Sequence, residues 1–280
     1  MKYKITNIEY GIGPWGTEVL YGEIGNPHPG ESENNIHSVT LLEGENGEKI
    51  LVDTGVDTED PAKDALWSEL IDTCKGVVWA LAQVGVTPDD IDTVILTHAH
   101  LDHIGGMLQF KNAQFYIQQK EFEAWEAMAA DPRYAQLTIP AAMASDYPPI
   151  RALIDEGRVT LFNGDVVNFR PGISLHVAYE CHSVAEQIVV VDTARGTCII
   201  GGDVACRPAN IFGAGEWTGF LAPTLGRSGS ARKVFETYRW IADTLDGDAS
   251  RLVLTHDVTM RDRFDNVATD EEGLFVHPVA

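Results

Sequence analysis

The sequence predicts an α/β fold in which several buried strands end at one shared chemical site. Short apolar runs rich in β-branched residues, typical of buried strands, alternate with longer stretches whose apolar residues recur at helical spacing. Three of the strand-like runs also lead directly into side chains that can bind a metal ion. Because the ends of neighbouring strands can lie together at one edge of a sheet, the pattern favours a single site at the edge of a sheet core.

The composition narrows the class of protein. The 280 residues include 44% hydrophobic residues, which is ordinary for a globular chain, and we expect one domain over residues 1–280. The 20 basic residues against 42 acidic ones give a net charge of −22. This balance argues against a nucleic-acid partner, whose phosphates would be repelled, and against an anionic membrane surface.

The compartment expected from the sequence is the cytoplasm. The first ten residues lack the basic flank and apolar stretch of a signal peptide, and no apolar run approaches the ~18 residues needed to span a bilayer. The four cysteines form no close pair, so we expect free thiols in a reducing environment.

The first half of the chain contains two strand patterns and a helix pattern. Ser38–Leu42 and Lys49–Val52 have the apolar character of strands. A helix is expected from Pro61, with Asp60 as its N-cap, and the apolar periodicity continues until Gly85, where we expect the helix to stop.

The remaining elements follow in the same way. A turn at Thr87–Asp90 precedes a buried strand over Val94–Leu96, and helical spacing predicts a helix over Lys120–Met128. Several prolines then predict an irregular excursion over residues 131–154, which could serve as a lid, a dimer contact or neither. A further helix is expected from Ser230.

The strongest chemical signal is the run His98-Ala99-His100-Leu101-Asp102-His103, which directly follows a predicted buried strand. In an extended segment His98 and His100 point to the same side and can bind one ion. Once the chain turns, Asp102 and His103 project toward a second position. Imidazole and carboxylate groups suit zinc, and also iron or manganese. A surface histidine cluster is the alternative interpretation, which the preceding buried strand disfavours.

Three later residues complete a possible ligand set. His182 follows a strand pattern, Asp203 follows the apolar run Cys198–Ile200, and His256 follows Leu252–Leu254. Taken alone, each would by default be a packed or hydrogen-bonded residue. Together with the cluster they give five histidines and two aspartates, enough for two ions that share a bridging carboxylate.

This motif with its three later partners resembles that of the metallo-β-lactamase superfamily. Asp53-Thr54-Gly55 and the turn before the strand at 94–96 fit the same family, and the resemblance spans residues 39–257. The branch it most resembles is the N-acyl homoserine lactonases, given its two complete metal sites, its length and the lack of an appended nucleic-acid or flavin domain.

The resemblance implies a four-layer αβ/βα sandwich with two divalent metal ions at the sheet edge, zinc in the first place and iron or manganese as alternatives. Asp102 and Asp203 would be catalytic as well as ligands, and Asp53 would orient ligands by hydrogen bonding. The implied metal ligands are His98, His100 and His182 for one ion, Asp102, His103 and His256 for the other, and Asp203 as the bridge.

The activity implied by the resemblance is hydrolysis of a lactone, a cyclic ester, by a hydroxide that bridges the two metals. The substrate would be a small molecule, with no nucleic acid or membrane partner, and the chain could form a homodimer. Alternatives on the same fold are a cyclic amide or imide hydrolase, a β-lactamase and a glyoxalase II-like thioesterase, although the few basic residues disfavour an anionic thiol carrier. A non-hydrolytic metal or redox protein ranks lowest.

Two positions depart from the pattern of this family. Glu186 stands where a second histidine is common, four residues after His182. Cys206 stands three residues after Asp203, where lactonases of this branch commonly carry a tyrosine. Cys206 could be a pocket wall, a soft metal contact or a nucleophile.

The candidate substrate contacts are weaker predictions. Arg207 could bind a substrate carboxylate or form a surface salt bridge. The aromatic segments Gly11–Tyr21, with Trp15, and Arg207–Arg227 could border the pocket or simply pack their loops. His37 could lie near the site, although no motif includes it.

Overall fold

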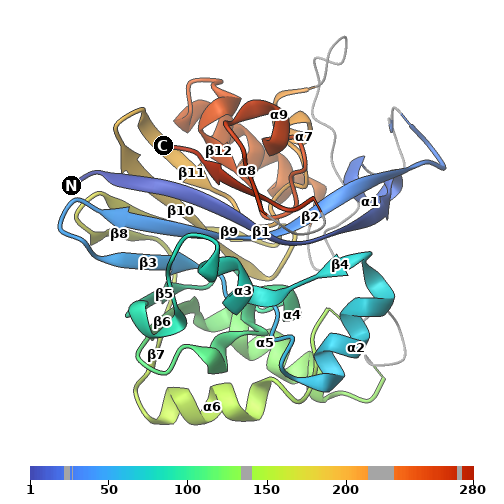
Figure 1. Ribbon diagram of the computed structural model, residues 1–280, viewed down its shortest axis with the longest axis vertical. Coiled ribbons are helices and arrows are strands. Elements are labelled where there is room, and N and C mark those ends of the chain that lie inside the picture. Colours follow the sequence, from blue (N-terminus) through green and yellow to red (C-terminus); the bar gives the residue numbers. More distant parts are fainter. Residues whose placement is uncertain (22–25, 27, 134–140, 214–229, 270–272) are drawn as a thin grey trace.

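A computed structural model of the chain describes residues 1–21, 26, 28–133, 141–213, 230–269 and 273–280. Helices cover both faces of a core of strands (Figure 1). The strands are β1 (Tyr3–Gly16), β2 (Ser32–Gly44), β3 (Lys49–Val52), β4 (Thr73–Cys74), β5 (Thr93–Ile95), β6 (Gln114–Gln118), β7 (Val159–Phe162), β8 (Val166–Arg170), β9 (Ile173–Tyr179), β10 (Ala185–Thr193), β11 (Gly196–Ile200), β12 (Leu252–Val253), β13 (Val267–Ala268) and β14 (Phe275–Pro278). The α-helices are α1 (Thr17–Tyr21), α2 (Pro61–Leu70), α3 (Gly76–Ala82), α4 (Leu101–Ile104), α5 (Gln119–Ala130), α6 (Tyr147–Asp155), α7 (Pro208–Phe212), α8 (Ala231–Thr244) and α9 (Met260–Arg263).

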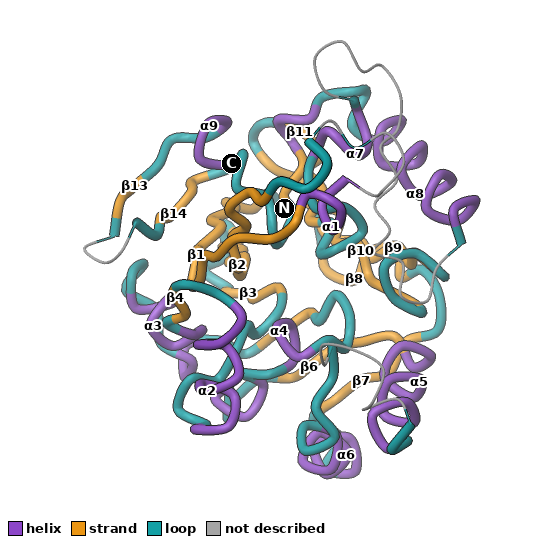
Figure 2. The backbone as a smooth tube through the Cα atoms, turned by 90° about the vertical axis from the view of Figure 1, so that its right-hand side faces the viewer, coloured by secondary structure: helices purple, strands orange, loops and turns teal. Residues whose placement is uncertain are grey.

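The strands form two facing mixed leaves, joined through the long central strands. Their hydrogen-bonded order is β12-β11-β10-β1-β2-β3-β5-β6-β7, and the remaining strands pair beside this path. Helices α2, α3, α5 and α6 lie on one outer face, whereas α7 and α8 lie on the other (Figures 1 and 2). This is the predicted four-layer αβ/βα sandwich.

Alternating residues of single strands enter different cores, which explains the continuous apolar runs in the sequence. Ile50 and Val52 of β3 pack into the core between the leaves, while Leu51 packs under the helices of the first face. In β11, Ile200 packs between the leaves and Ile199 packs under α8. Both faces of these strands are therefore buried, which requires apolar residues at every position.

The longest pairing joins β1 and β2 in antiparallel register along almost their whole length. A β-bulge interrupts it, because Glu9 pairs with Ser38 and Gly11 pairs with His37, which leaves Tyr10 as the extra residue. The Tyr10 hydroxyl donates a hydrogen bond to the carbonyl oxygen of Asp102, 3.1 Å away. The bulge therefore connects the central strands to the histidine-rich segment.

The single helix predicted from Pro61 to Gly85 is wrong. The chain forms α2 and α3 instead, and between them β4 pairs with β1. Asp60 caps α2 as expected, but the backbone becomes extended at Ile71. Gly76 then adopts a φ of +75°, which favours glycine and reverses the chain into α3. The apolar periodicity continued across the break because both helices pack on the same core.

The other predicted elements are present with shifted ends. The strand expected at Ser38–Leu42 is the centre of the longer β2, and the helix at Lys120–Met128 lies within α5. Ser230 caps α8 by accepting a hydrogen bond from the Lys233 amide. The excursion at 131–154 contains most of α6, while residues 134–140 lie outside the described part of the chain. No helix among the described residues is both long and apolar enough to cross a membrane.

Candidate metal centre

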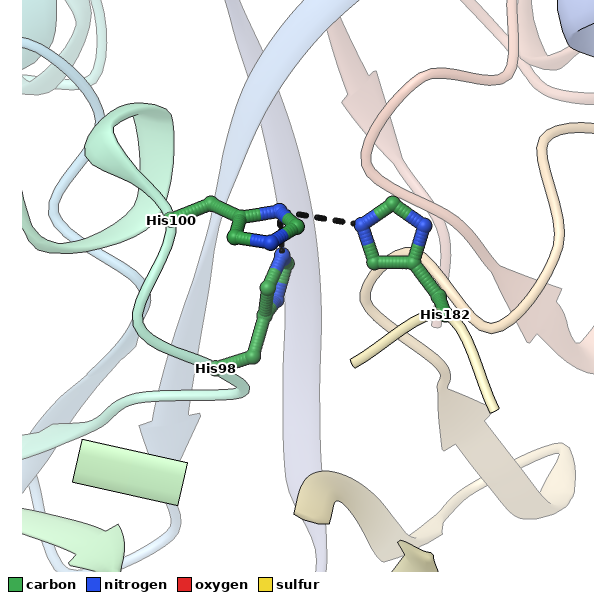
Figure 3. A group of neighbouring side chains, drawn as sticks. All are labelled: His98, His100 and His182. Atoms are coloured by element: carbon green, nitrogen blue, oxygen red, sulfur yellow. Dashed lines mark hydrogen bonds between the residues drawn. The ribbon is translucent and has the colours of Figure 1, made fainter. Parts of the chain in front are cut away.

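Three histidines from distant segments converge at the first metal-ligand group. His98 and His100 follow β5, and His182 lies in the turn between β9 and β10. The Nδ1 atom of His100 lies 2.9 Å from His98 Nε2 and 3.0 Å from His182 Nε2 (Figure 3). All three residues are buried, so their nitrogens face a small polar centre rather than solvent.

The Asp203 carboxylate lies at the middle of the histidine cluster. Its Oδ2 atom is 3.1 Å from His256 Nε2, 3.4 Å from His103 Nε2, 3.5 Å from His182 Nε2 and 4.0 Å from His98 Nε2. One oxygen thus lies close to a nitrogen of four histidines that come from three separate segments.

Asp102 and His256 form a second group. The Oδ2 atom of Asp102 lies 3.4 Å from His256 Nε2, and its Oδ1 atom lies 3.8 Å from His103 Nε2. The structure therefore brings together all seven residues that the sequence indicated as metal ligands. It also places His37 in this group, with Nδ1 3.6 Å from Asp102 Oδ2.

Hydrogen bonds on the far side of the rings orient His103 and His256. His103 Nδ1 lies 2.8 Å from Asp53 Oδ2, and His256 Nδ1 lies 2.8 Å from the carbonyl oxygen of Ile36. Since a carbonyl and a carboxylate can only accept, Nδ1 is the donor in both rings and Nε2 faces Asp203. The predicted orienting position of Asp53 is therefore observed.

Asp53 itself is held in an unusual backbone conformation. Its φ is +64°, and its side chain accepts hydrogen bonds from the amide (2.7 Å) and hydroxyl (2.9 Å) of Thr97. Gly106 packs against the backbone of Thr54, the residue after Asp53. Only glycine fits there, because a Cβ on Gly106 would lie 2.3 Å from the Thr54 carbonyl oxygen. The histidine-bearing segment therefore lies directly against the end of β3.

Glu121 connects the two histidine-bearing loops and was missed in the sequence. Its buried carboxylate accepts hydrogen bonds from the Ala99 amide (3.0 Å), the Ala185 amide (2.7 Å) and the Ser183 hydroxyl (2.5 Å). Ala99 lies between His98 and His100, whereas Ser183 follows His182. The sequence signal for this role is weak: Glu121 is an acidic residue next to Phe122, on the side of α5 that is buried.

Glu186 supports the central carboxylate from behind. Its Oε1 atom accepts a hydrogen bond from the Asp203 amide at 2.6 Å and lies 3.6 Å from His98 Nδ1. Burial and the nearby Asp203 charge raise the pKa of Glu186 well above its usual value. The side chain at this position therefore fixes the backbone of Asp203.

The first group is electrostatically suited to coordinate a cation. Burial lowers the pKa of His182 to about 4 and the pKa values of His98 and His100 well below their usual range. These imidazoles are thus neutral at pH 7, the state in which a nitrogen lone pair can bind a metal.

The second group favours positive charge. Burial lowers the pKa of His256, but the nearby carboxylates outweigh it and raise that pKa to about 9. The same balance raises the pKa of His103 well above its usual value. Within the part of the chain that the structure describes, neither Asp102 nor Asp203 pairs with a lysine or an arginine.

The donor set fits divalent metal ions. Among the described residues, His103 Nε2, His256 Nε2 and Asp203 Oδ1 are buried without a hydrogen-bond partner. Buried polar atoms are rarely left unpaired, and buried carboxylates need a compensating cation. Imidazole nitrogens and carboxylate oxygens are ligands that zinc, iron and manganese accept.

Cys206 and Arg207 lie inside the protein. Burial raises the pKa of the Cys206 thiol far above its usual value, which leaves no thiolate for nucleophilic attack. The Arg207 guanidinium donates hydrogen bonds to Asn35 Oδ1 (3.0 Å) and to the carbonyl oxygens of His256 (2.6 Å) and Asn34 (3.0 Å). Arg207 therefore ties β2 to the His256 loop and lies away from the surface and from solvent.

One of the two predicted aromatic walls borders the site. The half-buried Trp15 ring lies 4.8 Å from the His256 ring, measured between centroids. In the second segment, residues 214–229, including Trp217, Phe220 and Leu221, lie outside the described residues.

Comparison with known proteins identifies the family to which the sequence is similar. A sequence model of the metallo-beta-lactamase superfamily matches residues 33–256. An N-acyl homoserine lactonase of Bacillus cereus is 27% identical over 171 residues, 57% of this chain and 60% of the relative. A probable metallo-hydrolase of Methanocaldococcus jannaschii is 48% identical over 46 residues, 16% of this chain and 23% of the relative. These alignments thus span less than two thirds of either relative.

Solved structures show the same fold at low sequence identity. A quorum-quenching N-acyl homoserine lactone lactonase has a TM-score of 0.68 at 21% identity, covering 93% of this chain and 95% of its own. The dizinc lactonase AidC, in complex with a product, has a TM-score of 0.66 at 15% identity, covering 99% of this chain and 94% of its own. At these identities the likeness establishes the fold alone.

Replacing Arg207 by alanine is expected to destabilise the protein. Removing the guanidinium leaves the buried oxygens of Asn35 and His256 without its hydrogen bonds, so the free energy of unfolding should fall by about 3 kcal/mol or more. Urea denaturation measures the change. The control is Arg232→Ala, which removes an exposed pair with Glu236 and should cost at most about 0.5 kcal/mol. Equal losses in both variants would contradict the assigned role.

Proposed function

The chain belongs to the metallo-beta-lactamase superfamily, and from this premise we propose that it is a dinuclear metal-dependent hydrolase that opens a lactone. Zinc is the metal expected first, since the donors are imidazoles and carboxylates. The residues that would hold the two ions are His98, His100 and His182 for one, Asp102, His103 and His256 for the other, and Asp203 between them.

The observation that carries this proposal is the position of Asp203. Its Oδ2 atom lies within 3.1–4.0 Å of four imidazole nitrogens, which belong to both halves of the ligand set. A single bound ion would need only part of this set. A carboxylate shared between two groups of imidazoles is the arrangement that two neighbouring ions require, and the ions would supply the positive charge that the buried carboxylates otherwise draw from His103 and His256.

The chemistry divides between the ions and the side chains. When bound, two divalent ions polarise an ester carbonyl and make hydroxide available near neutral pH. Asp203 would carry a proton from the attacking water to the departing ring oxygen. Water thereby adds across the ring ester bond, since one carbon–oxygen bond forms, the ring bond breaks, and a hydroxy acid is released. Asp53 and the Ile36 carbonyl keep His103 and His256 oriented throughout.

Two further observations favour a small cyclic ester. Trp15 borders the second ligand group and offers a flat apolar surface to a ring or an acyl chain. Among proteins of the same fold, a point mutant of Bacillus thuringiensis AiiA was crystallised with N-decanoyl-L-homoserine at its active site, and AidC was crystallised with a product, N-hexanoyl-L-homoserine. The net charge of −22 disfavours polyanionic substrates.

The first experiment is a substrate panel with metal-replete protein, measured by proton release at neutral pH. The panel contains acyl homoserine lactones, simple γ- and δ-lactones, aromatic lactones, a cyclic imide, a penicillin and a glutathione thioester. We expect turnover of at least one lactone class, because the acid formed by ring opening ionises and releases a proton. Turnover of the thioester or the penicillin alone would contradict the lactonase proposal and assign another reaction to the same centre.

Loss of the shared carboxylate should abolish hydrolysis. Asp203→Ala is expected to lower kcat/KM by at least about 10³-fold, because it removes both a metal ligand and the proton carrier. Metal content and thermal unfolding are measured on the same samples. Asp192→Ala, on the exposed side of β10, is the control and should keep full activity. Full activity of folded Asp203→Ala would exclude the two-metal mechanism.

Cys206→Ser should retain activity within about tenfold of the parent protein. The buried thiol is protonated, so its removal affects packing rather than bond making. Hydrolysis rates and metal content are compared in the two proteins. A complete loss of activity with both metals still bound would instead make Cys206 a nucleophile.

A further inference from the structure

His37 is a buried histidine that the proposed mechanism does not use. It lies in β2, at 0% exposure, directly opposite the bulge in β1. Within the described residues, neither of its ring nitrogens has a hydrogen-bond partner. Buried polar atoms in proteins are normally paired, so an imidazole with two unpaired nitrogens indicates a partner of another kind.

Aromatic side chains surround the His37 ring on all but one side. Trp67, Trp15 and Tyr10 surround the ring, with centroid distances of 5.0, 5.6 and 6.1 Å. The remaining side faces the second ligand group, where the His256 ring lies 4.6 Å away. The aromatic side chains therefore hold the imidazole against Asp102 and His256, and they offer its nitrogens no acceptor.

The distances in this group match those between ligands of one ion. His37 Nδ1 lies 3.6 Å from Asp102 Oδ2, and His256 Nε2 lies 3.4 Å from the same oxygen. In sites of four to six ligands with bonds of about 2.0–2.2 Å, neighbouring ligand atoms are about 2.8–3.6 Å apart. One ligand atom from each of the three residues can be chosen so that all lie within 4.8 Å of one another.

From this geometry we propose that His37 is an additional ligand of the second metal ion, beside Asp102, His103 and His256. Two successive residues of β2 would then act on that ion, because the Ile36 carbonyl orients His256 and His37 binds the metal. Each of the two ions would be held by three histidines, with Asp203 between them. The inference depends on the proposed metal centre but not on the identity of the substrate.

The test is the count of ligating histidines in the cobalt(II)-loaded protein. Each bound imidazole gives one exchangeable N–H proton resonance that the paramagnetic ion shifts far outside the normal NMR range. His37→Phe keeps the ring in its aromatic surroundings but has no nitrogen. We expect this variant to lose one such resonance at saturating cobalt and to bind the weaker of its two ions about tenfold less tightly or worse.

Two further variants separate ligation from other roles. His37→Gln has an amide that can donate a hydrogen bond to Asp102 but has no imidazole. It should therefore keep the resonance count of the parent only if His37 merely positions that carboxylate. His176→Gln, a histidine stacked on Trp240 and outside every ligand group, is the control and should change nothing. Thermal unfolding of the metal-free proteins verifies the fold, and His37→Gln decides alone if His37→Phe does not fold.

The outcomes are distinct. Loss of one resonance in both His37 variants, with the control unchanged, supports ligation. An unchanged count in folded His37→Gln or His37→Phe overturns it and leaves the two-metal proposal intact. The absence of any shifted resonance in the parent protein with added cobalt would contradict the metal centre itself.

Discussion

The structure depends on the burial of one negative charge. The Asp203 carboxylate lies inside the protein and has no lysine or arginine partner among the described residues, so the surrounding histidines and the ions they could hold must compensate it. Its neighbours come from the segment after β5, the turn before β10 and the loop after β12. Because no local stretch could surround the carboxylate in this way, the two leaves must close before the site exists.

A second layer of side chains fixes the ligand positions without touching the centre. Glu121 bonds the loops that carry His98 and His182, and Glu186 holds the Asp203 amide. Arg207 likewise joins β2 to the His256 loop by donating hydrogen bonds to both. These ionisable residues are buried at positions where apolar residues would cost less free energy to bury, which indicates that they serve ligand geometry rather than general stability.

The sequence predicted the buried strands and the convergence of the ligands from local patterns, and the four-layer arrangement through the family resemblance that those ligands carry. Strands buried on two faces are apolar throughout, and His98, His100, Asp102 and His103 lie within six residues. His37 and Glu121 leave no such pattern, since each acts alone from the interior of an element. The division of residues 61–85 into two helices was also hidden, because both helices keep the same apolar face toward one core.

The extra residue in β1 has a consequence for how this protein can change over evolutionary time. Tyr10 interrupts the ladder opposite His37, and its hydroxyl reaches the segment that carries Asp102. Removing that one residue would leave every other pair of the two strands, and so the facing of their side chains, in place, but it would remove the hydroxyl that binds the Asp102 carbonyl. A single-residue deletion at the bulge would therefore be tolerated by the sheet and felt at the Asp102 segment, whereas the same deletion elsewhere in β1 would turn its side chains to the opposite face.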